Sequence, residues 1–388
     1  MLAEPTRALL RRAIIWVMSG VAVLLVLSLA WQWLPRQRSV NTGGGVGEQV
    51  SPADQTAQSA RAGPATPAPE ASEPAAAAAQ PPAPNSTVKL LLVGDMMFDR
   101  DIRLAAERHP DGYDFILAPV RQLLTDHDLV IGNLEGPVTT FKSRSAGSAV
   151  GSTDNFLFTF STKVPALLAR HQMRLVNLGN NHIGNFGPEG IAQTGRLLDL
   201  AQVEYFGCIG QPRFDAQRCL RQVEVGGLRL LFVNHNQFAE YDRQRVLEEL
   251  RRRVAGQLAS QTETAPTAQP DRPPDLTIVY AHWGSEYVTK AGPTVQDLAR
   301  AYVDAGADLV VGSHPHVVQQ SDQYQGVPIY YSLGNFVFDQ YFDENVRRGL
   351  ALTVEVDPVT TQFTLREHQL ELRPNGQTVL TDSNTAAN

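Results

Sequence analysis

The sequence predicts an α/β fold in which two mixed β-sheets pack face to face, with helices on their outer faces. Two observations lead to this prediction. From residue 88 to about residue 200, short apolar runs of strand character alternate with segments whose apolar residues recur at helical spacing. Beyond residue 203, strand-like runs follow one another more closely, with fewer helices between them. Two packed sheets flanked by helices would accommodate both the alternating strands and helices of the first part and the closely spaced strands of the second.

The first half of the pattern alternates expected strands with expected helices. Strands are expected at residues 88–93, 129–131 and 174–178, and helices at residues 101–108, 115–124, 164–170 and 188–200. The last helix begins with Pro188, which is tolerated there because the first N–H groups of a helix have no intrahelical partner.

The second half contains most of the expected strands. They are expected at residues 203–206, 220–225, 228–233, 276–280, 309–311, 327–332, 350–356 and 362–370, with helices at residues 244–258 and 295–305. Gly226-Gly227 separates two of these strands and predicts a two-residue hairpin turn, since both turn positions need a positive φ.

Residues 13–34 form an almost wholly apolar stretch without a charged residue. A membrane-spanning helix needs roughly 20 such residues, so we expect a transmembrane signal anchor here, preceded by a short cytoplasmic segment at residues 1–12. Arginines precede the span, in agreement with the positive-inside rule, which places the bulk of the chain outside the cytoplasm. The alternative is a cleaved signal peptide, because Ser28-Leu29-Ala30 offers small residues at suitable offsets for a peptidase.

Residues 35–86 consist mainly of Pro, Ala, Gly, Ser and Gln and hold hardly any large apolar residue. Such a segment cannot bury enough surface to offset the entropy of ordering it, so we expect a disordered linker. The globular domain is expected at residues 87–373 and a loose tail at residues 374–388. The sequence therefore predicts one folded domain on a membrane tether.

Charge and cysteine content narrow the choice of partner and compartment. The formal net charge is −7, and the arginine-rich segment at residues 243–253 mixes both signs at helical spacing. We therefore expect no nucleic-acid partner. Cys208 and Cys219 are close enough in sequence to form a disulfide in an oxidising compartment, but two buried free thiols explain them equally well.

Polar side chains follow several expected strands, at the point where each strand ends. They are Asp95, Asn133 and Glu135, Asn180 to His182, His282 to Glu286, and His314-Pro315-His316. In an open α/β sheet the carboxyl ends of the strands meet at a crevice where ligands bind. Carboxylate, amide and imidazole groups suit Mn, Zn or Fe ions. The pattern therefore predicts one site with a divalent metal ion.

Taken singly, these residues also have structural explanations. Asp95 and Asn133 lie in turns, where Asp and Asn often accept backbone hydrogen bonds. His182 and His282 could be half-buried histidines with satisfied hydrogen bonds. The paired histidines on either side of Pro315 are harder to explain by packing, and they favour a metal site.

Six ordered motifs span residues 94–336. In chain order they are Gly94-Asp95-Met96-Met97, Gly132-Asn133-Leu134-Glu135, Asn180-Asn181-His182, His282-Trp283-Gly284-Ser285-Glu286-Tyr287, Gly312-Ser313-His314-Pro315-His316 and Ser332-Leu333-Gly334-Asn335-Phe336. Together they resemble the CapA family of capsule and poly-γ-glutamate synthesis proteins. That family in turn looks like a divergent branch of the calcineurin-like metallophosphatases, which implies an α/β/β/α sandwich.

The resemblance implies a role for each motif residue. Metal ligands would be Asp95, Glu135, Asn181, His282, His314 and His316, the proton donor would be His182, and Asn133, Asn180, Glu286 and Asn335 would support the ligands or contact substrate. One or two ions of Mn, Zn or Fe are implied. Met97 departs from the metallophosphatase pattern, which has a His there, and a thioether is a poor ligand for hard divalent ions. A single-ion site is therefore the alternative to a pair.

The resemblance also implies a biological role. It is that of a membrane-anchored, extracytoplasmic protein in the synthesis, export or attachment of capsule or poly-γ-glutamate, with the anionic polymer and a membrane synthase complex as partners. Two alternatives stay open. One is a metal-dependent phosphoesterase or amide hydrolase unrelated to capsule, and the other is a non-catalytic scaffold that binds an anionic polymer.

Overall fold

The computed structural model describes residues 87–209, 216–256 and 272–381. The predicted cytoplasmic segment (1–12), transmembrane anchor (13–34) and linker (35–86) lie outside these residues and stay predictions. Within the described part of the chain, no helix is long and apolar enough to cross a bilayer.

The larger sheet combines strands from both ends of the described chain. Its order is β14-β13-β12-β1-β2-β3-β4, with β11 also paired to β1. The strands are β1 (Val88–Met96), β2 (Leu129–Leu134), β3 (Leu175–Asn177), β4 (Glu204–Phe206), β11 (Asn335–Val337), β12 (Arg348–Val356), β13 (Phe363–Leu372) and β14 (Thr378–Leu380). β1 to β4 run parallel, whereas β12 pairs antiparallel with β1 and β13. The carboxyl ends of β1, β2 and β3 therefore lie side by side.

The smaller sheet has the order β5-β6-β7-β8-β10-β9. Its strands are β5 (Leu220–Val225), β6 (Leu228–Asn236), β7 (Leu276–His282), β8 (Leu309–Ser313), β9 (Ser321–Tyr324) and β10 (Val327–Tyr330). β6, β7 and β8 are parallel neighbours, so their carboxyl ends also share one edge.

Side chains of the two sheets meet in a core between them. Leu90 and Leu92 of β1 lie in this core with Phe232 of β6 and Tyr280 of β7, and all are fully buried. The intervening Leu91 packs on the opposite face of its sheet, because successive side chains of a strand point to opposite faces.

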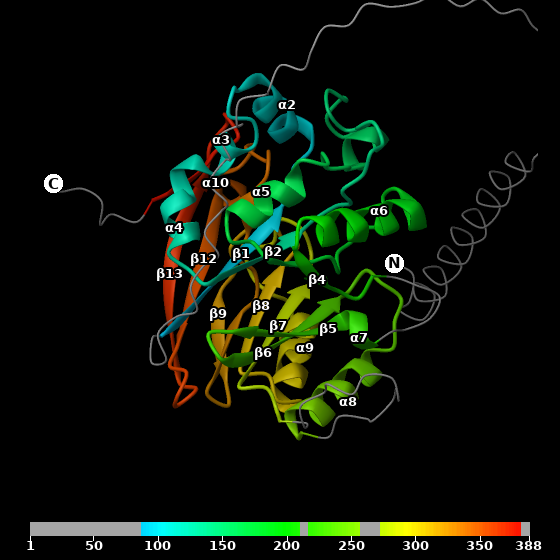
Figure 1. The fold of residues 1–388 in the computed structure, drawn as a ribbon. Helices are drawn as coiled ribbons and strands as arrows, with labels where there is room; N and C mark the ends of the chain where they lie inside the picture. The colour runs from blue at the N-terminus through cyan, green and yellow to red at the C-terminus, as the bar shows by residue number, and fades with distance from the viewer. Residues whose placement is uncertain (1–86, 210–215, 257–271, 382–388) are drawn as a thin grey trace, which may run out of the picture. The chain divides into compact units, whose positions relative to one another are not determined.

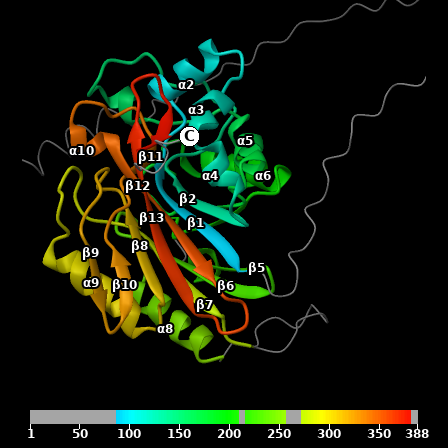
Figure 2. The same cartoon turned by 90° about the vertical axis from the view of Figure 1, so that its left-hand side faces the viewer.

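Helices cover the outer face of each sheet (Figures 1 and 2). Those over the larger sheet are α2 (Arg100–Arg108), α3 (Asp114–Leu117), η1 (Ala118–Val120), α4 (Arg121–Thr125), α5 (Val164–Arg170) and α6 (Gly187–Leu200); α8 (Arg243–Val254) and α9 (Pro293–Asp304) cover the smaller one. The short elements η2 (Thr153–Phe156), α7 (Ala216–Cys219) and α10 (Glu344–Arg347) lie in connections. The predicted fold class, two mixed sheets flanked by helices, is confirmed.

The hairpin turn at Gly226-Gly227 is also confirmed, since both glycines have positive φ and Val225 pairs with Leu228 across the turn. Cys208 and Cys219 are joined by a disulfide, which decides between the two alternatives that the sequence left open.

Three expectations about elements were wrong. The single helix expected at residues 115–124 is divided into α3, η1 and α4, with Pro119 in η1, because proline has no N–H to continue the helical hydrogen bonds. The tail expected to be loose contains β14, which pairs with β13. The short strands β9 and β11 were not predicted. β11 pairs with β1, which is far away in the sequence, so no local pattern announces it. β9 pairs with β10, and both strands are too short to show an alternating pattern.

Candidate metal centre

The polar residues predicted from the strand ends lie together at one end of the two sheets. Asp95 lies near the end of β1, and Glu135 directly follows β2. His282 is the last residue of β7, while His314 and His316 follow β8. The two sheets therefore both contribute to the site, because the carboxyl ends of β1 and β2 face those of β7 and β8.

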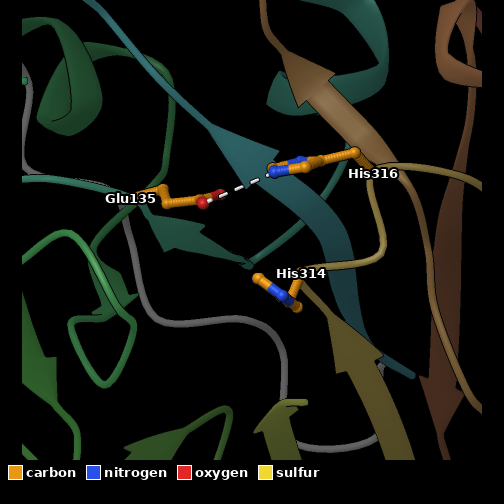
Figure 3. Close-up of side chains that lie close together, drawn as sticks. All are labelled: Glu135, His314 and His316. Carbon is orange, nitrogen blue, oxygen red and sulfur yellow. Dashed lines mark ion pairs between the residues drawn. The ribbon is translucent and has the colours of Figure 1, made fainter. Parts of the chain in front are cut away.

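Glu135, His314 and His316 form the centre of this cluster. Their potential ligand atoms all lie within 4.8 Å of one another, and all three side chains are buried. Figure 3 shows the carboxylate pointing toward the imidazoles, with His316 Nε2 3.7 Å from Glu135 Oε1. Two imidazoles and one carboxylate are ligand types that suit Zn, Mn or Fe.

Several polar atoms in this cluster lack partners. Both carboxylate oxygens of Glu135 and the Nδ1 atom of His314 are buried without a hydrogen bond to any described residue. A buried polar atom left unpaired costs about 1–3 kcal/mol, and more when it is charged. Burial, followed by the nearby charges of Asp95 and Glu286, raises the pKa of Glu135 well above its usual value. A cation between these atoms would remove the cost, so the residues present fit a metal ion.

The backbone around the two histidines is unusual. His314 and His316 both have positive φ, 93° and 56° respectively. Residues other than glycine rarely adopt this conformation, and such strain concentrates at functional sites. The N–H of His314 donates to Asp95 Oδ2 at 2.9 Å, which holds the loop in place. Strain and anchoring together orient both imidazoles toward Glu135.

Asp95 is fully buried beside the histidines. It accepts a hydrogen bond from Asn133 Nδ2 at 2.7 Å, and its oxygens lie 3.4 Å from His316 Nδ1 and 4.0 Å from His282 Nδ1. Burial opposes ionisation of Asp95, but the hydrogen bonding and charge of His316, with that of His282, hold its pKa below its usual range. Asp95 therefore supplies the negative charge that positions the histidines.

His282 and Asn181 form the neighbouring part of the site. His282 Nε2 donates to Asn181 Oδ1 at 2.9 Å, because an amide oxygen can only accept. The ring of His282 lies 4.9 Å from that of His314, and its Nδ1 is 2.9 Å from Ser313 Oγ. Burial lowers the pKa of His282 well below its usual value. These two predicted ligands are thus adjacent to the central cluster.

The predicted supporting asparagines do contact the predicted ligands. Asn335 Oδ1 accepts from His316 Nδ1 at 2.9 Å, which orients the ring with its Nε2 atom toward Glu135. Asn133 Oδ1 accepts from Asn180 Nδ2 at 3.1 Å and from Asn177 Nδ2 at 3.0 Å. These amides form a fixed layer beneath the centre. Asn177, the last residue of β3, was not predicted as a site residue from the sequence, although it lies only three positions before Asn180.

His182 is half-buried at the edge of the site. Its Nδ1 donates to Asn185 Oδ1 at 3.1 Å, and its ring stacks on Phe158 with centroids 4.3 Å apart. Burial lowers the pKa of His182 to about 4. His182 is therefore neutral near pH 7, which the sequence could not show because it does not reveal how far the ring is removed from water.

Glu286 and Met97 lie apart from the central cluster. The side chain of Glu286 is exposed, and its influence on the site is through the charge that it presents to Glu135. Met97 packs in the core between the larger sheet and its helices, and its sulfur accepts a hydrogen bond from Asp99 N–H. Met97 is therefore a core side chain whose sulfur is already engaged, and we assign it no ligand role.

Two aromatic residues of the site were missed in the sequence. Phe238, in the loop after β6, places its ring 4.3 Å from that of His314 and 5.8 Å from that of His282. Tyr287 lies 6.1 Å from His316 and accepts a hydrogen bond from Gln340. Both are exposed. Tyr287 belongs to a quoted motif, but no sequence signal connects Phe238 with the histidines.

Comparison with known proteins supports the family resemblance. Residues 89–340 match the family model described as bacterial capsule synthesis protein PGA_cap. The capsule biosynthesis protein CapA of Bacillus anthracis is 31% identical over 66% of this chain and 61% of the relative. The PGA biosynthesis protein CapA of Bacillus subtilis (strain 168) is 31% identical over 64% of this chain and 62% of the relative. The chain thus spans somewhat less than two thirds of the length of these relatives.

Solved structures give weaker likenesses. A novel phosphatase from Mycoplasma pneumoniae shares 14% identity over 74% of this chain and 94% of its own, with a TM-score of 0.46. The purple acid phosphatase PPD1 of yellow lupin (Lupinus luteus) shares 12% identity over 77% of this chain and 55% of its own, with a TM-score of 0.29. The assignment rests on the match over residues 89–340: the chain belongs to the family of bacterial capsule synthesis proteins PGA_cap.

Proposed function

We propose that this protein is a membrane-anchored, extracytoplasmic component of the machinery that makes, exports or attaches poly-γ-glutamate or a related capsule polymer, and that it works through its metal centre. Family membership and the similarity to proteins of capsule and PGA biosynthesis support the biological context. The observation that carries the metal centre is the set of unpaired, buried atoms of Glu135 and His314 within 4.8 Å of His316.

Two features support a location outside the cytoplasm. The apolar stretch at residues 13–34 is long enough to anchor the chain, and residues 35–86 have the composition of a flexible tether. The disulfide between Cys208 and Cys219 suits an oxidising compartment, since the cytosol keeps most thiols reduced. The anchored domain would then reach a polymer at the outer face of the membrane.

The residues of the centre divide into holding and orienting roles. Glu135, His314 and His316 would hold the ion, with His282 and Asn181 completing the ligand set of one or two ions. Asn335 orients the ring of His316, and Asp95 anchors the loop of His314. A bound Mn, Zn or Fe ion supplies Lewis-acid polarisation and lowers the pKa of a coordinated water.

Charge explains why such a centre suits an anionic polymer. The carboxylates of Asp95 and Glu135 are buried at the site, and Glu286 adds a negative charge at its rim. Arg100 is a cation whose charge acts on Glu135, but it is already paired with Asp339. The protein side chains alone would therefore repel a polyanion, and the ion provides the positive charge that attracts it.

The chemistry that best fits the centre is hydrolysis of a phosphoester or of an amide in the polymer. His182 lies beside the ligand Asn181, and with its lowered pKa it is uncharged at neutral pH. It would therefore position a water or leaving group by hydrogen bonding instead of donating a proton as an imidazolium. A scaffold that grips the polymer without cleaving it is the second candidate, because Met97 leaves one metallophosphatase ligand position without a donor.

The test is metal analysis of the full chain purified in detergent, with Mn and Zn supplied during growth. We expect one or two equivalents in the wild type and less than half as much in Glu135→Gln and in His314→Ala. His109→Ala is the matched control, because His109 is a partly exposed imidazole away from the site. Equal metal content in all four proteins would overturn the metal assignment.

Chain-length analysis of poly-γ-glutamate after incubation with the metal-loaded protein then separates the two candidates. Shortening that is lost in His314→Ala supports hydrolysis. Binding of the polymer without shortening supports the scaffold.

A further inference from the structure

A pocket of about 410 Å³ opens beside the metal centre. This volume falls in the range of roughly 300–1,000 Å³ that is typical of small-molecule sites. Two lining residues connect it to the centre: Asn181, which is bonded to His282, and Phe238, whose ring lies against that of His314. A group bound in the pocket would therefore extend from the reacting position.

About half of the residues that line the pocket are apolar. Ile183, Ile191 and Ile209 line it together with Phe238 and Ala239. Apolar walls of this kind favour an apolar occupant by roughly 25 cal/mol for each Å² removed from water. The part of the occupant that contacts these side chains is therefore a hydrocarbon stem.

The buried amides of the pocket are already engaged. Asn180 Nδ2 donates to Asn133 Oδ1 and to the carbonyl of Leu134, and its own oxygen accepts two backbone N–H groups. Asn236 Nδ2 donates to the carbonyls of Asn180 and Cys208. These two side chains have no donor left for a carboxylate or phosphate, so neither can solvate an anionic occupant.

Glu240 carries the only charge among the described residues that line the pocket. Its side chain is exposed, and no hydrogen bond or ion pair to another described side chain satisfies it. A carboxylate at the mouth of a partly apolar pocket complements an ammonium group at the end of a hydrocarbon stem.

From this charge complementarity we propose that the pocket binds the amine-bearing component of the substrate, a primary ammonium on an aliphatic stem, next to the metal centre. The proposal rests on the proposed function for calling the occupant a substrate component. It adds that the site takes two chemically different groups, an anionic one at the ion and a cationic one at Glu240.

The experiment compares three four-carbon probes of different charge: n-butylamine, 1-butanol and butyrate. Each is titrated into the full chain in detergent by ligand-observed NMR, with empty micelles as the blank. EDTA is present, so that the result does not depend on whether the proposed metal binds. We expect butylammonium to bind about three- to fivefold more tightly than butanol, the size of an exposed ion pair, and butyrate to bind most weakly.

Two variants locate the effect. Glu240→Gln should make the amine and the alcohol bind equally, while Phe238→Ala should weaken both by a similar factor. Glu248→Gln is the matched control, because Glu248 is an exposed carboxylate on α8 that does not line the pocket. Equal binding of amine and alcohol in the wild type, a preference that persists in Glu240→Gln, or tighter binding of butyrate would each overturn the proposal.

Discussion

Two buried carboxylates close to the larger sheet, Asp99 and Glu135, have opposite environments. Asp99 accepts hydrogen bonds from Arg103 Nε, from the hydroxyls of Ser143 and Ser145, and from the N–H of Thr159, at 2.7–2.8 Å. Glu135 has no hydrogen-bond partner for either oxygen among the described residues. Both side chains are fully buried.

The comparison teaches that burial of an acid does not by itself indicate function. The four donors around Asp99 offset its desolvation and connect α2 to the chain segment at residues 143–159, which is a structural role. Among the described residues, the oxygens of Glu135 lack such hydrogen-bond donors, and in the proposed metal centre a bound ion would take their place, which is a binding role. The two acids should therefore respond in opposite ways to substitution.

The largest expected effect is at Asp99. Asp99→Ala leaves Arg103 and three further donors without their acceptor, and we expect a loss of about 3–5 kcal/mol in the free energy of unfolding. Denaturant unfolding measures this loss. Asp111→Ala is the control, since Asp111 is exposed and should change stability by no more than about 0.5 kcal/mol. Equal stability of the two variants would show that the hydrogen bonds to Asp99 do not stabilise the fold.

The next largest effect is expected at Glu135. In the absence of metal, substitution of Glu135 should not lower the free energy of unfolding, in contrast to substitution of Asp99. Glu135→Gln removes a buried acid, so the metal-free variant should be at least as stable as the wild type. Metal at 100 times its dissociation constant should stabilise the wild type by about 2.7 kcal/mol and the variant much less.

Thermal unfolding with EDTA and with added Mn measures both parts of this prediction. Glu107→Gln, at an exposed carboxylate, should behave as the wild type under both conditions. If Glu135→Gln were less stable than the wild type with EDTA and were stabilised by Mn as much as the wild type, Glu135 would have a structural role like that of Asp99.

A smaller effect, on the pH dependence of stability, is expected at His127, a buried histidine whose two ring nitrogens both have partners. His127 is buried like His314, but its Nδ1 donates to the carbonyl of Leu123 and its Nε2 lies 2.8 Å from Thr353 Oγ1. Burial lowers its pKa, so below pH about 6.5 the unfolded chain binds a proton that the folded chain does not. Stability should therefore fall as the pH falls, by at most about 1.4 kcal/mol per pH unit for one proton.

Unfolding at several pH values between 5 and 8 tests this histidine. His127→Gln should show a shallower loss of stability below pH about 6.5 than the wild type. Identical pH profiles would mean that His127 is protonated equally in the folded and unfolded states.

The smallest effect is expected at Met97. Because Met97 packs in the core and supplies no ligand, Met97→Leu should cost less than about 1.5 kcal/mol. Its metal content should equal that of the wild type. A loss of metal in this variant would place Met97 at the centre and contradict its position in the structure.

The sequence by itself determined the fold class and the approximate positions of most elements. The apolar run of β1 and the glycine pair between β5 and β6 are local signals, and local signals are visible in a sequence. It also determined the strand-end residues of the centre, because parallel strands bring their carboxyl ends to a common edge. Residues 94–336 carry the motifs of the family in order.

Only the tertiary structure decided which of those residues meet and in what environment. Glu135 and His316 are far apart in sequence and come from different sheets, so their 3.7 Å approach depends on how the sheets pack. The same packing half-buries His182 against Phe158, places Met97 in the core and brings Phe238 against His314. Burial, pairing and pKa depend on neighbours that are distant in sequence, and no local pattern encodes them.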